Sequence, residues 1–96
     1  MMVLITYDIN TETPAGQKRL RKVAKTCQNY GQRVQDSVFE CMLDSAQLAQ
    51  LKHSLTELID IEKDSRRFYQ MGDKWSGRVD HVGAKASLDL TGPLVA

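Results

Sequence analysis

The carboxylate of Asp8 is the clearest candidate for chemistry, because it closes a hydrophobic run over residues 2–9. A carboxylate that is buried without a partner destabilises a fold, so we expect Asp8 at a strand end, where a polar site can form. Mg²⁺ usually takes one or two carboxylates together with waters and phosphate oxygens. One Asp8 would hold this ion weakly, whereas two copies that meet near a two-fold axis would share it and repel each other without it.

A run of basic residues is the second feature with functional potential. Between Thr13 and Gln35 the chain carries basic side chains and no acidic ones, although its net charge is only +1. Clustered Lys and Arg bind phosphate backbones by releasing counterions, but the same pattern also fits a solvated helix face. Both interpretations stay open. The basic residues of the run are Lys18, Arg19, Arg21, Lys22, Lys25 and Arg33.

Other chemistry-bearing residues give weaker signals. The sequence has no glycine-rich phosphate loop, no zinc-spaced cluster and no serine nucleophile motif. Cys27 and Cys41 fit apolar positions of a helix and a strand, which predicts buried thiols. His53 and His81 are isolated, so we expect structural roles for both. The remaining aspartates, among them Asp64, fall at helix ends or in loops, where a solvated role suffices.

Length and composition set the broad class. Ninety-six residues with 42% hydrophobic content predict one small domain with a core. No apolar run approaches the roughly eighteen residues of a membrane span. The N-terminus lacks the basic and apolar regions of a secretory signal, so we predict a cytoplasmic protein without a membrane segment.

The first third of the chain predicts a strand followed by a helix. The nearly continuous apolar run over residues 2–9 is typical of a central strand or one covered on both faces. Thr13 can cap the next helix, with Pro14 in its first turn. We expect Gly31 to end this helix in the left-handed conformation. The inward stripe consists of Gly16, Leu20, Val23, Ala24, Cys27 and Tyr30.

The middle third predicts a hairpin and a second helix. Residues 32–43 read as β structure, and Asp36-Ser37 offers turn chemistry for a tight hairpin. Asp44 and Gln47 resemble a capping box that opens the second helix. The apolar stripe of that helix consists of Leu48, Leu51, Leu55, Leu58 and Ile59.

The last third predicts one clear strand over residues 64–71, a loop over 72–77 and a short extended piece over 78–82. The resulting order is β-α-β-β-α-β, so the predicted fold class is α+β. We expect the ferredoxin-like arrangement, with both helices on one face of an antiparallel sheet and a short C-terminal extension. We assign residues 1–83 to the domain. The tail over 84–96 is either disordered or an added strand on a partner chain.

Two segments resemble the CRISPR-associated protein 2 family, and the resemblance extends through the second helix to Phe68-Tyr69. These segments are Tyr7-Asp8-Ile9 and Gly31-x-Arg33-Val34-Gln35-x-Ser37-Val38-Phe39-Glu40. The resemblance implies a small ferredoxin-like homodimer from the spacer-acquisition machinery of prokaryotic antiviral defence. It also implies a divalent metal, which we take as Mg²⁺, shared between the two subunits. Many members are described as metal-dependent endonucleases that act on single-stranded RNA or duplex DNA.

Carried over to this sequence, the resemblance makes Asp8 the metal-binding and catalytic residue. It places Arg19 and Arg33 near the site, and we include both with the catalytic residues. Gln17 is neutral where relatives can carry a second arginine, which leaves fewer charges near the phosphate. Tyr7 fits either the core or the site. With the basic run included, the expected nucleic-acid-binding residues are Lys18, Arg19, Lys22, Arg33 and Ser37.

Two functions from different classes follow. The first is a Mg²⁺-dependent endonuclease, a phosphodiester hydrolase, with duplex DNA favoured because no aromatic series suggests a single-strand stacking platform. The alternative is a non-catalytic scaffold that binds duplex DNA and bridges the partner integrase, CRISPR-associated protein 1. No general base can be assigned beside Asp8, which favours the scaffold slightly. A small-molecule regulator with this fold would leave the basic run and the Tyr-Asp pair unexplained.

Overall fold

The structure, a computed structural model, describes residues 1–72 of the chain. The predicted loop that carries Trp75, the extended piece over 78–82 and the tail over 84–96 lie outside the described residues. The described elements are β1 (Met2–Asp8), α1 (Pro14–Gln28), β2 (Gly31–Gln35), β3 (Val38–Met42), α2 (Ser45–Leu58) and β4 (Ser65–Gly72).

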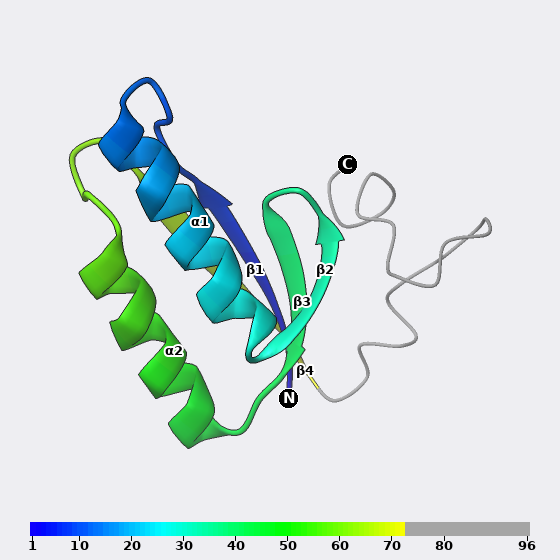
Figure 1. Cartoon of the computed structure of the whole chain (residues 1–96). Coiled ribbons are helices and arrows are strands. Elements are labelled where there is room, and N and C mark those ends of the chain that lie inside the picture. Colours follow the sequence, from blue (N-terminus) through cyan, green and yellow to red (C-terminus); the bar gives the residue numbers. More distant parts are fainter. Residues whose placement is uncertain (73–96) are drawn as a thin grey trace.

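The order of these elements confirms the ferredoxin-like arrangement. All pairings in the four-stranded sheet are antiparallel and the strand order is β2-β3-β1-β4, so β1 is central. Both helices cover the same face of the sheet, and α1 lies beside α2 (Figure 1). Because β1 and β4 pair in the antiparallel direction, the last residue of β1 lies beside the first residue of β4, at one end of the strands.

Strand β1 is buried on both faces, as its continuous apolar run predicts. Val3 and Ile5 are fully buried and pack in the main core beneath the helices. Met2 and Leu4 point to the opposite face, where they form a smaller cluster with Met71 of β4. Because side chains alternate along a strand, Thr6 and Asp8 belong to this second, helix-free face. Asp8 itself is exposed, in agreement with the expected position at the strand end.

Helix α1 begins where the sequence predicts. Thr13 is the N-cap, and its Oγ1 accepts a hydrogen bond of 3.1 Å from the amide of Gly16, while Pro14 occupies the first turn. Gly16 is buried against the loop that follows β1. A Cβ atom at this position would overlap the carbonyl oxygen of Asn10. The absence of a side chain thus lets the helix start directly beneath the end of β1.

The predicted end of α1 is wrong. The helix ends at Gln28, so Tyr30 packs against the core from the following turn rather than from the helical stripe. Gly31 does not adopt a positive φ and instead begins β2. A Cβ atom on Gly31 would overlap the carbonyl oxygen of Glu40 and the sulfur of Cys41. Glycine is required there by the close approach of β2 to β3, not by a left-handed turn.

The hairpin and the second helix follow the predicted signals. Asp36 and Ser37 form the turn between β2 and β3. Asp44 Oδ1 accepts a hydrogen bond of 2.7 Å from the Gln47 amide, and Gln47 Oε1 accepts one of 3.0 Å from the Asp44 amide. This reciprocal pair is the predicted capping box. With 15 residues in α1 and 14 in α2, no helix in the described region is long and apolar enough to cross a membrane.

Both cysteines are buried free thiols, as predicted. Burial raises the pKa of Cys27 to about 12 and that of Cys41 to about 11. The thiolate is the reactive form of cysteine, so these side chains act as small core residues at neutral pH.

We predict that Gly16→Ala destabilises the fold by about 1–3 kcal/mol, because the added methyl group must displace a backbone carbonyl rather than a mobile side chain. Urea denaturation of the variant and the wild type gives the difference in free energy of unfolding. The control is Lys18→Ala at an exposed position of the same helix, where we expect a change within about 0.5 kcal/mol. Equal effects of the two substitutions would contradict the tight contact.

Candidate active site

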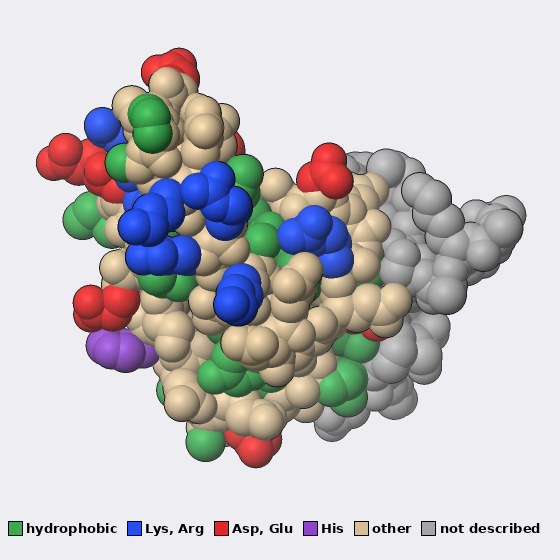
Figure 2. All heavy atoms as spheres, in the orientation of Figure 1, with side chains coloured by type: hydrophobic (Ala, Val, Ile, Leu, Met, Phe, Trp, Pro, Cys, Tyr) green, Lys and Arg blue, Asp and Glu red, His purple; other side chains and the backbone are tan. Residues whose placement is uncertain are grey.

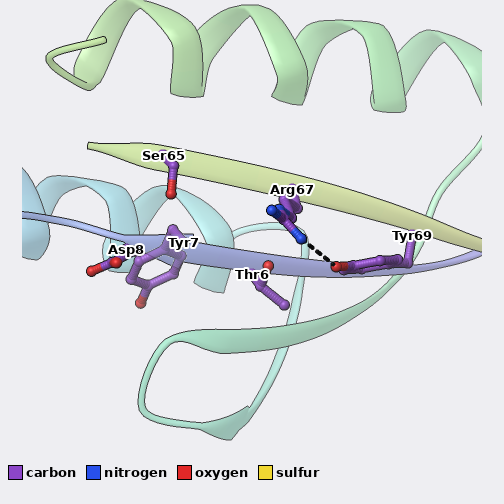
Figure 3. A pocket seen from close by; sticks show the side chains of 6 residues that line it. All are labelled: Thr6, Tyr7, Asp8, Ser65, Arg67 and Tyr69. Atoms are coloured by element: carbon purple, nitrogen blue, oxygen red, sulfur yellow. Dashed lines mark hydrogen bonds between the residues drawn. The ribbon is translucent and has the colours of Figure 1, made fainter. Parts of the chain in front are cut away.

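Asp8 lies in a shallow polar pocket at the junction of β1 and β4 (Figure 3). The pocket has a volume of about 300 Å³. Its lining combines one carboxylate, one guanidinium and several hydroxyl groups, which suits a polar or charged ligand. The lining residues are Thr6, Tyr7, Asp8, Ser65, Arg67 and Tyr69.

The antiparallel register of β1 and β4 assembles this pocket. Asp8 pairs with Ser65, and Thr6 pairs with Arg67. Phe68 packs in the main core beneath the helices, so its neighbours Arg67 and Tyr69 point to the helix-free face that carries Asp8. The sequence prediction missed the β4 residues of the pocket. The signal that could have found them was the alternation of Arg67 and Phe68 in a strand expected to pair with β1.

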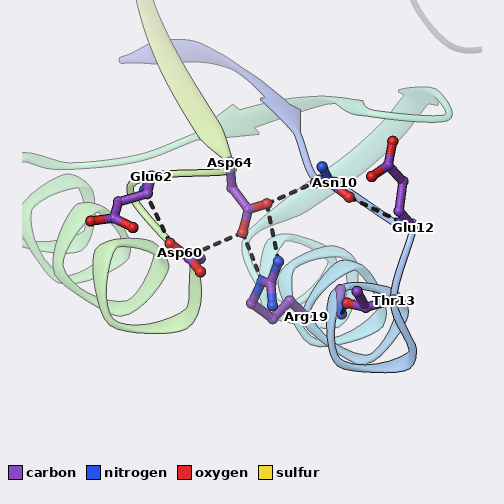
Figure 4. Close-up of polar contacts among 8 residues, drawn as sticks. Asn10, Glu12, Thr13, Arg19, Asp60, Glu62 and Asp64 are labelled. Atoms are coloured by element: carbon purple, nitrogen blue, oxygen red, sulfur yellow. Dashed lines mark hydrogen bonds and ion pairs between the residues drawn. The ribbon is translucent and has the colours of Figure 1, made fainter.

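A second carboxylate, Asp64, stands just before β4 and holds the surrounding segments together (Figure 4). Its side chain is fully buried and faces the guanidinium of Arg19. Oδ2 accepts from Arg19 Nε at 2.8 Å and from the Asp60 amide at 2.8 Å. Oδ1 accepts from the Asn10 amide at 2.9 Å and from Arg19 Nη2 at 3.4 Å. The expectation of a solvated role for Asp64 is therefore wrong.

The pKa of Asp64 reflects a contest between burial and hydrogen bonding. Burial favours the neutral acid, but the hydrogen bond from Arg19 and the amides of Asp60 and Asn10 outweigh it and lower the pKa below its usual value. Asp64 is thus an anion at neutral pH. Because the Arg19 guanidinium is turned toward this carboxylate, Arg19 does not line the pocket of Asp8.

Tyr7 belongs to the core, and it also ties the hairpin turn to the end of β1. Its ring stacks on Phe39 at a centroid distance of 6.2 Å, and its hydroxyl donates to the carbonyl of Asp36 at 3.2 Å. The Tyr7 amide donates to the carbonyl of Ser37 at 3.1 Å. Burial raises the pKa of the Tyr7 hydroxyl, which therefore remains a hydrogen-bond donor. Ser37 thus lies next to the residue that precedes Asp8, but it does not line the pocket.

Arg33 lies on the other side of the sheet from Asp8. It is exposed, pairs across the strands with Phe39, and its guanidinium carbon is 5.3 Å from the centroid of the Phe39 ring. Phe39 is fully buried in the helix-covered core, so Arg33 caps that core at the edge strand β2. Within one chain, the structure does not bring Arg33 together with Asp8.

The basic residues of α1 form an exposed surface. Lys and Arg side chains gather over α1 and the adjoining hairpin in one view of the molecule (Figure 2). Acidic residues are absent from α1 itself. We call this surface the α1 basic face. It consists of the exposed residues Lys18, Arg21, Lys22 and Lys25.

The donor set around Asp8 bears on the expected metal. No group of three or more His, Cys, Asp or Glu residues suited to a metal ion occurs in residues 1–72. Of the described residues that line the pocket, Asp8 is the one that supplies a carboxylate, and the other possible metal ligands are hydroxyl oxygens. All of these donors are hard oxygen atoms, which fits Mg²⁺ provided that a second carboxylate, waters or phosphate oxygens complete its coordination.

Comparison with known proteins assigns the family. The family model described as CRISPR associated protein Cas2 matches residues 1–79. The chain belongs to this family. It is 62% identical to the CRISPR-associated endonuclease Cas2 of Halalkalibacterium halodurans and 60% identical to the CRISPR-associated endoribonuclease Cas2 of Chlorobaculum tepidum, in both cases over 99% of each chain.

A solved structure agrees with the assignment. The crystal structure of Streptococcus pyogenes Cas2 matches with a TM-score of 0.77 and 60% sequence identity, covering 86% of this chain and 100% of that chain. The resemblance inferred from Tyr7-Asp8-Ile9 and the segment around Arg33 is therefore confirmed.

We predict that Asp64→Asn lowers the free energy of unfolding at pH 7 by about 3 kcal/mol, because it leaves the Arg19 charge without its buried partner. The folded-state pKa of Asp64 is lowered, so its contribution is fully present above the ordinary aspartate pKa of 3.8 and is lost as pH falls through the lower folded value. The gap between the wild type and the variant should therefore narrow toward pH 3. Urea denaturation at both pH values measures it, with exposed Asp36→Asn as the matched control.

Proposed function

We propose that this chain is a metal-dependent endonuclease that hydrolyses phosphodiester bonds of nucleic acid in the CRISPR system. The observation that carries the proposal is the exposed Asp8 carboxylate at the end of the central strand, in a polar pocket. The names of the relatives, endonuclease and endoribonuclease, support the reaction class. The cytoplasm remains the predicted compartment.

The proposed active form is a homodimer in which two Asp8 carboxylates face one Mg²⁺ ion. One carboxylate per chain is a weak ligand set, and a two-fold axis near Asp8 supplies the second. When bound, the ion supplies positive charge against the scissile phosphate and favours deprotonation of an attacking water. In the proposed reaction the attacking water would lose a proton to solvent and its oxygen would add to phosphorus. The bond from phosphorus to the leaving sugar oxygen would break, and that oxygen would take up a proton from solvent.

The α1 basic face is proposed to bind the nucleic-acid backbone. Lys18 and Lys22 are exposed and have no ion-pair partner among the described residues, so both are available to phosphates. Arg33 and Ser37 remain proposed contacts on the neighbouring hairpin. We propose duplex DNA as the favoured substrate and single-stranded RNA as the second candidate, with a role in the spacer-acquisition stage.

A non-catalytic scaffold is the second candidate function. Among the described residues, no histidine or glutamate that could act as a general base lines the pocket of Asp8, and the α1 basic face does not depend on Asp8. In this alternative the dimer binds duplex DNA and bridges the integrase, CRISPR-associated protein 1. In that case, substitution of Asp8 should leave DNA binding intact, whereas substitutions on the α1 basic face should weaken it.

We predict that Asp8→Asn abolishes cleavage, because the substitution removes the carboxylate charge that holds the metal ion. The assay uses labelled duplex DNA and single-stranded RNA with Mg²⁺ or EDTA, after both proteins are shown to have the same oligomeric state. Asp36→Asn, an exposed carboxylate in the hairpin turn, is the matched control and should cleave like the wild type. Cleavage that persists in Asp8→Asn would contradict the proposal, and binding without any wild-type cleavage would favour the scaffold.

We predict that Lys18→Gln/Lys22→Gln weakens nucleic-acid binding and lowers its salt dependence. Each lost phosphate contact should reduce the slope of log K against log salt concentration by about 0.9 for duplex DNA or about 0.7 for a single strand. The slope is obtained from fluorescence anisotropy titrations at several salt concentrations between roughly 50 and 200 mM, a range over which phosphate contacts change the affinity strongly. Lys52→Gln/Lys63→Gln on the other helix and its following turn removes the same charge and should change the slope by less than half as much.

A further inference from the structure

Arg67 is a cation in the pocket of Asp8 that has no acidic partner among residues 1–72. The ion pairs among residues 1–72 are Arg19–Asp64 and His53–Glu57, and neither involves Arg67. Its guanidinium instead donates a long hydrogen bond of 3.5 Å from Nη1 to the hydroxyl of Tyr69 (Figure 3). Arg67 is also exposed, so its remaining N–H donors are available to a ligand.

The register of the strands keeps Arg67 near Asp8 without pairing the two. Thr6 stands directly opposite Arg67, and Asp8 stands opposite Ser65, so Asp8 and Arg67 are diagonal neighbours. Diagonal residues of an antiparallel pair lie about 7–8 Å apart on the same face. Both side chains line one pocket, so a phosphate bound there would have the Asp8 carboxylate on one side and the Arg67 guanidinium on the other. The hydroxyls of Thr6 and Ser65 line the same pocket and offer further donors.

The two adjacent arginines of β4 differ in their surroundings. Arg66 points to the helix-covered face, where Nη2 donates to Thr56 at 2.9 Å and the guanidinium lies 4.9 Å from the centroid of the Phe68 ring. Its cation is thus used to join β4 to α2. Among the described residues, Arg67 makes no comparable contact with another helix or strand, so its guanidinium is available to bind a ligand.

We propose that Arg67 binds the phosphate of the nucleic-acid backbone next to Asp8, with Tyr69 holding the guanidinium in position. Arginine presents two parallel donors that match two phosphate oxygens, and it stays charged at every working pH. The inference rests on the proposed function, because it takes the phosphodiester substrate from it. It deepens that function by naming the cation on the substrate side of the Asp8 pocket, a role that the family resemblance implies for Arg19 and Arg33.

The test compares Arg67→Gln, Arg67→Lys and Arg66→Gln. All three are first compared with the wild type in thermal unfolding. Dissociation constants for a labelled single-stranded RNA and a labelled DNA duplex are measured by anisotropy in Ca²⁺, and kcat and KM are measured in Mg²⁺. We expect Arg67→Gln to raise the Kd and KM about tenfold for the cleaved substrate, as expected when charge-assisted hydrogen bonds are lost. Arg67→Lys keeps the charge and should recover part of the loss.

Arg66→Gln removes the same charge one residue away on the opposite face, and its Kd should change less than twofold. Equal effects of Arg66→Gln and Arg67→Gln on the Kd would overturn the proposal, because they would show general attraction only. The proposal would also be overturned if Arg67→Gln folds normally and its Kd and KM equal those of the wild type. If the wild type cleaves neither substrate, the proposed nuclease fails, while the Kd values in Ca²⁺ still decide whether Arg67 binds phosphate.

Discussion

The buried ion pair between Asp64 and Arg19 is the interaction on which the geometry of the site depends. A fully buried carboxylate is tolerated only when its charge and lone pairs are satisfied, and here four donor contacts satisfy it. They come from the loop after β1, from α1 and from the turn before β4. Asp64 thereby fixes the end of β1 beside the start of β4, which is the condition for Asp8 and Arg67 to share a pocket.

The fold separates the tasks that the sequence suggests for its charged residues. Arg19 is engaged with Asp64, and Arg33 covers Phe39 at the edge of the core, so both have structural contacts. Lys18 and Lys22 remain exposed on α1, whereas Arg67 remains exposed beside Asp8. In this account, α1 attracts the backbone of the nucleic acid, and the helix-free face of the sheet holds the phosphate to be cleaved.

Local signals made most of the fold predictable. Thr13 and Pro14 start α1, and Asp44 with Gln47 starts α2, because caps depend on residues within one turn of each other. The apolar run of β1 indicated a central strand, which in turn placed Asp8 at an accessible end.

Features that depend on long-range contacts were not predictable in the same way. Asp64 and Arg19 are 45 positions apart, so nothing in the local sequence shows that this aspartate is buried. The proximity of Arg67 to Asp8 follows from the β1–β4 register, which the sequence alone does not fix. The prediction of a left-handed Gly31 failed for a related reason. The glycine is required by the close approach of β3, and the residues next to Gly31 in the sequence do not indicate that contact.

The binding position of the metal ion tests the central claim most directly. Mn²⁺ can replace Mg²⁺ at oxygen sites, and its unpaired electrons broaden the NMR signals of nearby amides. Titration of ¹⁵N-labelled protein with Mn²⁺ should first broaden the amides at the end of β1 and the start of β4, around Asp8 and Ser65, and Asp8→Asn should remove this effect. Broadening centred instead on the acidic turn around Asp60 and Glu62, and unchanged in Asp8→Asn, would contradict the account.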